Sequence, residues 1–204
     1  MAEEQSTLIV RDAAAWVQWL TVNHGQSSGV WLGLAKKGTT EPTSLTYDEA
    51  LQEALCHGWI DGQVRRLDER IYRQRFTPRR PRSSWSKRNV GIVERLTGEG
   101  RMRPAGIAAV EQAKADGRWE EAYAGPATAQ VPEDLAAALR AQPAAQAMFE
   151  VLSSQNRYAV LYRIASAKRA DTRARRIEQF VAALARGETL YPQKRRPSEL
   201  DARP

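Results

Sequence analysis

The stretch W-I-D-G-Q-V-R-R-L-D-E-R-I-Y-R-Q-R-F-T-P, residues 59–78, decides the fold of this 204-residue chain. It predicts two strands, 59–67 and 71–77, joined by a turn at residues 68–69. In the second strand two kinds of side chain alternate: Ile71, Arg73 and Arg75 with Tyr72, Gln74 and Phe76. Because successive side chains of a strand point to opposite faces, this pattern predicts arginines on one face and aromatic rings on the other.

Helices are predicted on both sides of this hairpin. Asp12 is typical of the N-cap of a helix over 13–23, and residues 30–34 have the pattern of a short buried strand. Thr46, with Glu49 three residues later, has the spacing of a capping box that begins the next helix. Further helices are predicted from Ser84 or Ser86 to residue 96 and over 104–115. Residues 1–125 are therefore predicted to form an α+β domain, a small sheet packed by helices.

The second part of the chain has a different pattern. After an irregular stretch, four amphipathic helices are predicted at 133–141, 143–152, 155–168 and 172–186. No strand pattern interrupts them, so we expect residues 126–190 to form an all-α module. Residues 191–204 contain Pro192, Pro197 and several basic residues, which predicts a disordered tail.

Positive charge is concentrated in one segment. Residues 63–88 contain 10 basic and 2 acidic residues, a net charge of +8, whereas the whole chain carries +7. The flanking residues 1–62 and 89–156 carry −5 and −3, and residues 157–204 carry +7. Clustered charge of one sign creates a local field that holds an anion, so this segment is where we expect a ligand.

The run F-T-P-R-R-P-R-S-S-W-S-K-R-N, residues 76–89, predicts an anion-binding loop. Arginine side chains present planar donors that match phosphate oxygens, and serine hydroxyls and a helix N-terminus add further donors. Trp85 would stack on a base. We expect the ligand to be a phosphate-bearing molecule or a nucleic acid, held by Lys36, Lys37, Arg73, Arg75, Arg79, Arg80, Arg82, Ser83, Ser86 and Lys87. The alternative is that these arginines form ion pairs with the two acidic flanking segments.

A small enzyme is a second hypothesis. Asp61, in the run G-W-I-D-G, would be a general base, and Cys56 a nucleophile, in a pocket lined by Trp59 and Trp85. Against this, Cys56 and His57 are adjacent, and adjacent side chains of a helix point about 100° apart. Core packing is the more common role for a tryptophan such as Trp59, and the more common role for a carboxylate such as Asp61 is to orient an arginine. We therefore predict no catalytic residue.

Other classes of protein are disfavoured. Two histidines and one cysteine match no metal-ligand spacing, and no nucleotide-binding glycine motif is present, so we predict no metal and no cofactor. The polar N-terminus, the single cysteine and the lack of a long apolar run predict a cytoplasmic protein without membrane insertion. The oligomeric state stays open. A third hypothesis is that the helical module binds an acidic protein through the basic residues of 163–176.

Several blocks resemble one family. The C-terminal blocks V-P-E-D-L-A-A-A-L-R-A-Q-P-A-A-Q-A-M-F-E-V-L and I-A-S-A-K-R-A-D-T-R-A-R-R-I are similar to the helical module of the YdeI/OmpD-associated proteins. Upstream blocks such as V-W-L-G-L-A-K-K and M-R-P-A-G extend the resemblance over 16–187. It implies a role in protection against bacteriocins or antimicrobial peptides and supplies no catalytic residues. His57 departs from the family pattern, in which an aromatic residue such as Phe is common.

Overall fold

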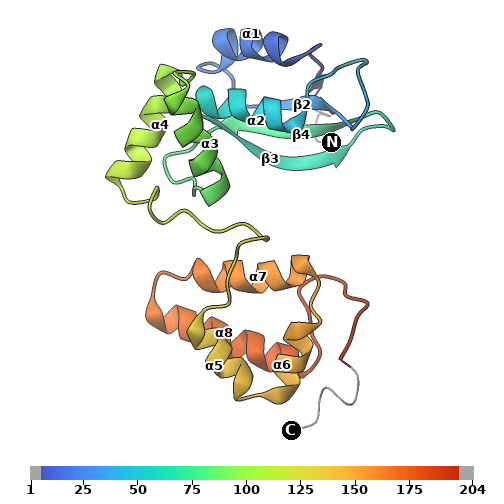
Figure 1. Ribbon diagram of the computed structural model, residues 1–204, viewed down its shortest axis with the longest axis vertical. Helices are drawn as coiled ribbons and strands as arrows, with labels where there is room; N and C mark the ends of the chain where they lie inside the picture. Colours follow the sequence, from blue (N-terminus) through green and yellow to red (C-terminus); the bar gives the residue numbers. More distant parts are fainter. Residues whose placement is uncertain (1–5, 198–204) are drawn as a thin grey trace. The chain divides into compact units, whose positions relative to one another are not determined.

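The computed structural model describes residues 6–197 and divides the chain into two compact units, Met1–Ala122 (unit 1) and Tyr123–Pro204 (unit 2). Unit 1 contains a four-stranded sheet with helices, and the described part of unit 2 is helical (Figure 1). The fold class is therefore α+β, as the sequence predicts. The sequence places the domain boundary after residue 125, and the division in the structure falls at residues 122–123.

The sheet of unit 1 has the order β1-β2-β4-β3. Its strands are β1 (Thr7–Leu8), β2 (Val30–Ala35), β3 (Trp59–Arg66) and β4 (Ile71–Pro78). β1 runs parallel to β2, and the other two neighbouring pairs are antiparallel. The sequence analysis missed β1, because two residues are too short to show an alternation. The other three predicted strands are confirmed, and their ends agree with the structure within a residue or two.

The β3–β4 hairpin closes where the sequence predicts. The Asp68 carboxylate accepts hydrogen bonds from the backbone N–H groups of Arg70 and Ile71, at 2.7 and 2.8 Å. Gln74 and Phe76 are buried on the face that meets the helices. The guanidinium of Arg73 lies over Trp31 on the opposite face. The predicted separation of arginines from aromatic rings in β4 is thus confirmed.

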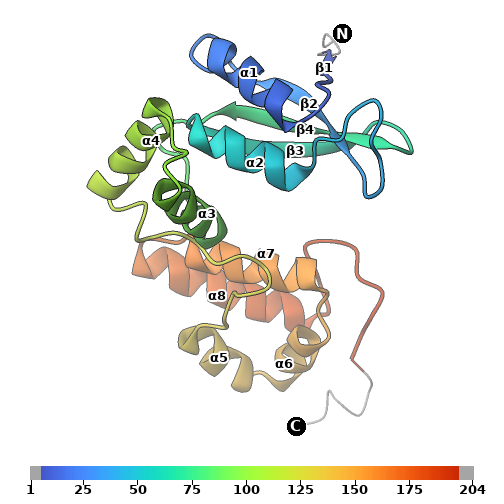
Figure 2. The same cartoon turned by 45° about the horizontal axis from the view of Figure 1, so that its top comes forward.

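Helices α1 (Ala13–Asn23) and α2 (Tyr47–Cys56) pack on one face of this sheet (Figure 2). Asp12 caps α1, and the capping box of Thr46 and Glu49 begins α2, both as predicted. The indole N–H of Trp16 donates to the carbonyl of Ala50 at 3.1 Å and ties the two helices together. The core between helices and sheet consists of Trp16, Leu20, Leu32, Leu34, Leu45, Ala50, Ala54, Trp59 and Phe76.

Helices α3 (Lys87–Gly98) and α4 (Pro104–Ala115) pack against α2 and complete unit 1. Their shared core with α2 consists of Leu51, Leu55, Trp85, Val93, Val110, Ala113 and Ala122. The approach of α4 to α2 is close at Gly106. A Cβ at this position would lie 2.2 Å from the carbonyl oxygen of Cys56. Only a glycine fits there without moving the backbone.

Unit 2 contains α5 (Glu133–Arg140), α6 (Pro143–Glu150), α7 (Ser154–Ala165) and α8 (Ala170–Ala185), close to the four predicted helices. Each has an apolar stripe, and these stripes meet in a separate core. Its buried members are Leu135, Leu139, Ala145, Met148, Phe149, Val160, Leu161, Ile164, Ile177 and Leu184.

The structure differs from the sequence prediction at the end of unit 2. Residues 188–193, which we name the strap, lie against α7 instead of forming a free tail from residue 191. Asn156 on α7 is 1% exposed, and its side chain donates to the carbonyl of Tyr191 and accepts from the N–H of Tyr191. The Gln193 side chain donates to the carbonyl of Val151. Hydrogen bonds to a distant helix leave no pattern in the local sequence. Residues 198–204 of the predicted tail lie outside the described residues.

Two glycine substitutions test the packing of unit 1. We expect Gly106→Ala to lower the free energy of unfolding by about 2 kcal/mol or more, because the new methyl group meets backbone rather than a movable side chain. Gly91→Ala on α3 meets nothing within 4 Å and is expected to raise that free energy by about 0.5–1 kcal/mol. All six tryptophans lie in unit 1, so denaturant unfolding followed by tryptophan fluorescence reports this unit. Equal effects of the two changes would contradict the close approach of α4.

Candidate functional site

The structure divides the predicted anion-binding residues into separate groups. Lys36 and Lys37 follow β2, which pairs with the start of β4 in the register Ala35↔Ile71. Arg79 and the loop that contains it follow the other end of β4. Eight residues at about 3.3 Å per residue separate the two ends by roughly 25 Å. The expected grouping of Lys36 and Lys37 with the loop is therefore wrong, because antiparallel pairing places them at opposite ends of the strand.

Lys36 and Lys37 have other surroundings. The Lys36 ammonium group donates to the carbonyl of Asp68 in the hairpin turn, at 2.7 Å. Lys37 and Arg70 line a polar hollow with residues 38–41, which include the acidic Glu41. These two lysines thus stabilise or border the turn end of the hairpin.

The serines of the loop are engaged with the backbone. The Ser83 hydroxyl accepts from the N–H of Arg80 at 3.2 Å. The Ser86 hydroxyl accepts from the N–H of Asn89 at 3.1 Å and caps α3, one of the two cap positions that the sequence predicts. Each hydroxyl keeps its own O–H as a donor. The loop is therefore fixed in shape, with Arg80, Arg82 and Lys87 exposed along it.

Trp85 is not available to a ligand. Its ring is 2% exposed, lies under the guanidinium of Arg79 at 3.5 Å, and meets Trp119 edge-on at 4.8 Å between centroids. Trp59 is 1% exposed and belongs to a different core cluster. The pocket that the sequence analysis placed between Trp59 and Trp85 is thus wrong, because both rings are buried among apolar side chains. The polar neighbours of Trp85 in the sequence gave no sign of this.

Most of the basic segment is not neutralised by carboxylates. Arg66 forms an ion pair with Glu69, and Arg88 forms one with Asp48 at 2.7 Å. Within residues 6–197, no carboxylate lies within ion-pair distance of six other basic residues of the segment. These six, which we name the basic ribbon, are Arg65, Arg70, Arg75, Arg80, Arg82 and Lys87. The ion-pair alternative therefore does not account for the cluster of charge.

The acidic neighbours have other partners. On α3 and α4, Glu99 pairs with Arg95 and Arg101, and Glu111 pairs with Lys114. Asp48 and Glu53 belong to α2, on the helix-covered face of the sheet. These four carboxylates are thus used locally or lie on α2, on the other side of the sheet from the arginines of β4.

The face of the sheet opposite α1 and α2 carries an arginine–tryptophan cluster. The guanidinium carbons of Arg65 and Arg73 lie 5.0 and 5.1 Å from the centroid of the Trp31 ring. Arg65 and Arg73 are also direct neighbours across the β3–β4 pair. Two like charges held side by side repel each other. The predicted ligand-binding residues did not include Arg65. Trp31, in the predicted buried strand 30–34, is 7% exposed, and its alternation with Leu32 places it on the face opposite the helices.

Asp61 holds a tyrosine rather than an arginine. The Tyr47 hydroxyl donates to the Asp61 carboxylate at 2.9 Å. Burial, together with the charge of Asp61, raises the pKa of Tyr47 to about 12. A phenol with this pKa stays protonated at neutral pH and donates to one of the two carboxylate oxygens of Asp61. The hydrogen bond therefore positions Tyr47 of α2 against Asp61 of β3.

Cys56 and His57 do not form a nucleophile–base pair. Burial, and next the charge of Glu53, raises the pKa of the Cys56 thiol to about 11. Burial lowers the pKa of His57, whose Nδ1 lies 2.8 Å from the carbonyl oxygen of Glu53. His57 instead meets His24, with 5.6 Å between ring centroids. A protonated thiol beside a neutral imidazole that points elsewhere has no nucleophilic activation.

The part of the chain that the structure describes offers neither a metal site nor a membrane-spanning helix. No three His, Cys, Asp or Glu side chains come together as a metal site there. None of the helices in that part has the length and apolar character needed to cross a membrane.

We expect Cys56 to resist alkylation in the native protein. With a pKa of about 11, about one thiol in a thousand is ionised at pH 8. Iodoacetamide labelling at pH 8, followed by mass spectrometry, should be slow for the folded chain and fast in denaturant. Rapid labelling of the folded chain would contradict a protonated, buried thiol and would revive the enzyme hypothesis.

His57 should make unit 1 less stable in mild acid. An unfolded histidine takes up a proton near pH 6.5, whereas the lowered pKa of His57 delays protonation in the folded state. The free energy of unfolding should therefore fall as the pH decreases below about 6.5. In His57→Phe this fall should be smaller, because the titrating group is gone and His24 remains as the common background. Denaturant titrations between about pH 7.5 and 5 measure it, and identical slopes for the two proteins would refute the assignment.

Comparison with known families separates the two units. Residues 8–109, 102 residues and half of the chain, match a domain family of unknown function, DUF8412. Residues 128–187 match the bacteriocin-protection, YdeI or OmpD-associated family, OmdA. This confirms the family resemblance for the helical module, while the N-terminal blocks belong to a separate family. No curated protein and no solved structure matches the chain.

Proposed function

We propose that this chain, which belongs to the DUF8412 family and carries an OmdA domain of the bacteriocin-protection type, binds an anionic ligand along its basic ribbon. The observation that supports the proposal is the set of six cations without a carboxylate partner among the described residues. Phosphate groups bound to these six cations would reduce the repulsion between them.

The arrangement favours an extended ligand over a single phosphate. A site for one phosphate needs several donors aimed at one point. Arg75 lies within β4, whereas Arg80, Arg82 and Lys87 follow in the loop and at the start of α3. Cations spread along a strand and a loop match a row of phosphates, as in a nucleic-acid backbone. The buried Trp85 provides no stacking platform, so we expect binding that depends on charge and has little preference for sequence.

The match to the OmdA family supports a role in protection against bacteriocins, and the basic ribbon suggests how this role would be carried out. Nucleic acid inside the cell is a ligand remote from the surface that an external peptide reaches. We therefore propose a cytoplasmic protein that acts without catalysis and protects indirectly. An acidic protein could present similar charges to the ribbon, and such a partner is one outcome of the experiment below.

The test is fluorescence anisotropy with labelled single- and double-stranded DNA and RNA over a salt series. The variant is Arg80→Glu/Arg82→Glu/Lys87→Glu, whose side chains are exposed. Arg79 is left unchanged because it stacks on Trp85. We expect the variant to bind at least tenfold more weakly. The slope of log affinity against log salt should decrease by about 2–3, since each phosphate contact contributes about 0.7–0.9.

The control is Arg175→Glu/Lys194→Glu/Arg195→Glu, which changes the net charge equally at three exposed positions outside the ribbon. It should keep most of the affinity. If both variants lose affinity equally, the attraction is a property of the net charge and the site is refuted. If wild type and ribbon variant bind equally weakly, nucleic acid is the wrong ligand class, and an acidic polypeptide such as polyglutamate becomes the next probe.

A further inference from the structure

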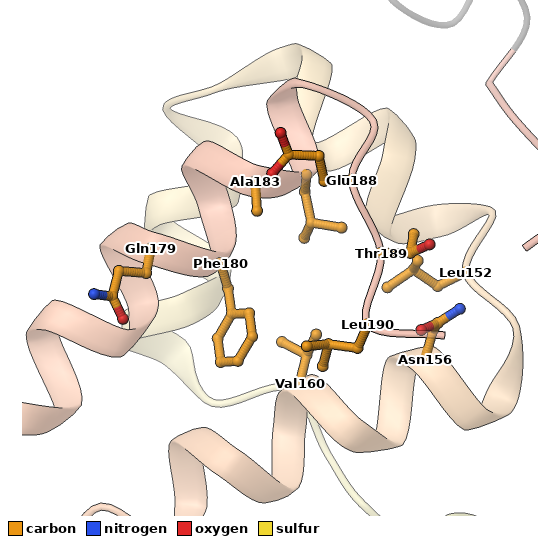
Figure 3. A pocket seen from close by; sticks show the side chains of 10 residues that line it. Leu152, Asn156, Val160, Gln179, Phe180, Ala183, Glu188, Thr189 and Leu190 are labelled. Atoms are coloured by element: carbon orange, nitrogen blue, oxygen red, sulfur yellow. The ribbon is translucent and has the colours of Figure 1, made fainter. Parts of the chain in front are cut away.

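Unit 2 contains an apolar hollow that is independent of the basic ribbon. It lies between α7, α8 and the strap and has a volume of about 210 Å³ (Figure 3). Figure 3 shows the side chains of Val160, Phe180, Ala183 and Leu190 around this space. Val160 and Leu184 belong to the buried core of unit 2, so the hollow reaches this core, whereas Leu190 at its rim is 42% exposed.

No free charge is available to a ligand inside the hollow. Both carboxylate oxygens of Glu188 accept hydrogen bonds from Arg186, each at 2.9 Å. The Asn156 amide is used by the backbone of Tyr191, and the Thr189 hydroxyl donates to the carbonyl of Tyr191. A charged group would lose its hydration here and would find only the neutral amide of Gln179 as a partner. The lining therefore selects uncharged, apolar groups.

The strap holds the hollow open. An apolar space of this size would normally be reduced by movement of the nearest flexible segment. Here Asn156 binds both the N–H and the carbonyl of Tyr191, and Gln193 binds the carbonyl of Val151. These bonds fix the distance of the strap from α7, and Leu190 is held at the edge of the space. Gly187, at a φ of +73°, turns the chain from α8 into the strap.

We infer that this hollow binds a small uncharged apolar ligand, about the size of one aromatic ring or a short branched alkyl chain. An apolar protein cavity of about 150 Å³ takes up a ring of this size. The volume of about 210 Å³ and the apolar walls fit such a group, with polar substituents left at the strap. The inference does not depend on anion binding, since the two sites use different residues in different units.

The experiment is saturation-transfer NMR on the full chain with toluene and indole, with benzoate as a charged comparison of similar size. We expect saturation transfer to toluene and indole with a Kd in the millimolar range or tighter, and little to benzoate. Toluene should also raise the Tm of unit 2. No saturation transfer at millimolar toluene would overturn the inference and leave the hollow as a packing defect.

The matched variants are Ala183→Phe, which places a ring inside the hollow, and Val22→Phe, which adds the same ring at a 69% exposed position of unit 1. Ala183→Phe should weaken toluene binding at least tenfold, and Val22→Phe should not change it. Equal binding by all three proteins would place toluene elsewhere and refute the site. If Ala183→Phe does not fold, Leu190→Ala replaces it. That variant removes one wall and should lower toluene affinity severalfold, and unchanged affinity would again refute the site.

Discussion

The alternation of side chains along β4 is the constraint on which unit 1 depends. β4 is paired on both sides, with β2 and with β3, so neither of its faces can rotate away. Phe76 and Gln74 must therefore meet α1 and α2, and Arg73 and Arg75 must lie on the opposite face. A shift of one residue would bury the arginines, which makes the register strongly specified. The same alternation separates the arginines from the carboxylates of α2. For Arg75, the member of the basic ribbon that lies within β4, this separation from the carboxylates of α2 is thus a consequence of how the sheet is covered.

Local signals made most of the fold predictable. Asp12, the Thr46–Glu49 capping box and the β4 alternation act through neighbouring residues, and the structure bears out each of them. The site was less predictable. Lys36 and Lys37 were grouped with the loop because both are basic, but strand pairing decides which ends meet, and this is a non-local property. Trp85 lies between serines in the sequence, yet it is buried by residues that follow much later, such as Trp119.

In unit 2, too, local patterns could be predicted from the sequence and non-local contacts could not. Helical periodicity predicted α5 to α8, because each segment has apolar residues at helical spacing. The strap has no such pattern, since its position depends on hydrogen bonds from Asn156, more than thirty residues upstream. The apolar hollow follows from the strap and was equally invisible: every residue that lines it is an ordinary member of a helix or loop. The burial of Asn156, which points to the hollow, becomes evident only from the structure.

The two units offer opposite kinds of chemistry. Unit 1 presents charge along an extended strand and loop, and its affinity for an anion would fall steeply with salt. Unit 2 presents a partly open apolar hollow, whose affinity for a ring or alkyl group would not fall with salt, because burial of apolar surface involves no phosphate contacts and no counterions. The family matches fall separately on the two units, which is the pattern of two modules joined in one chain.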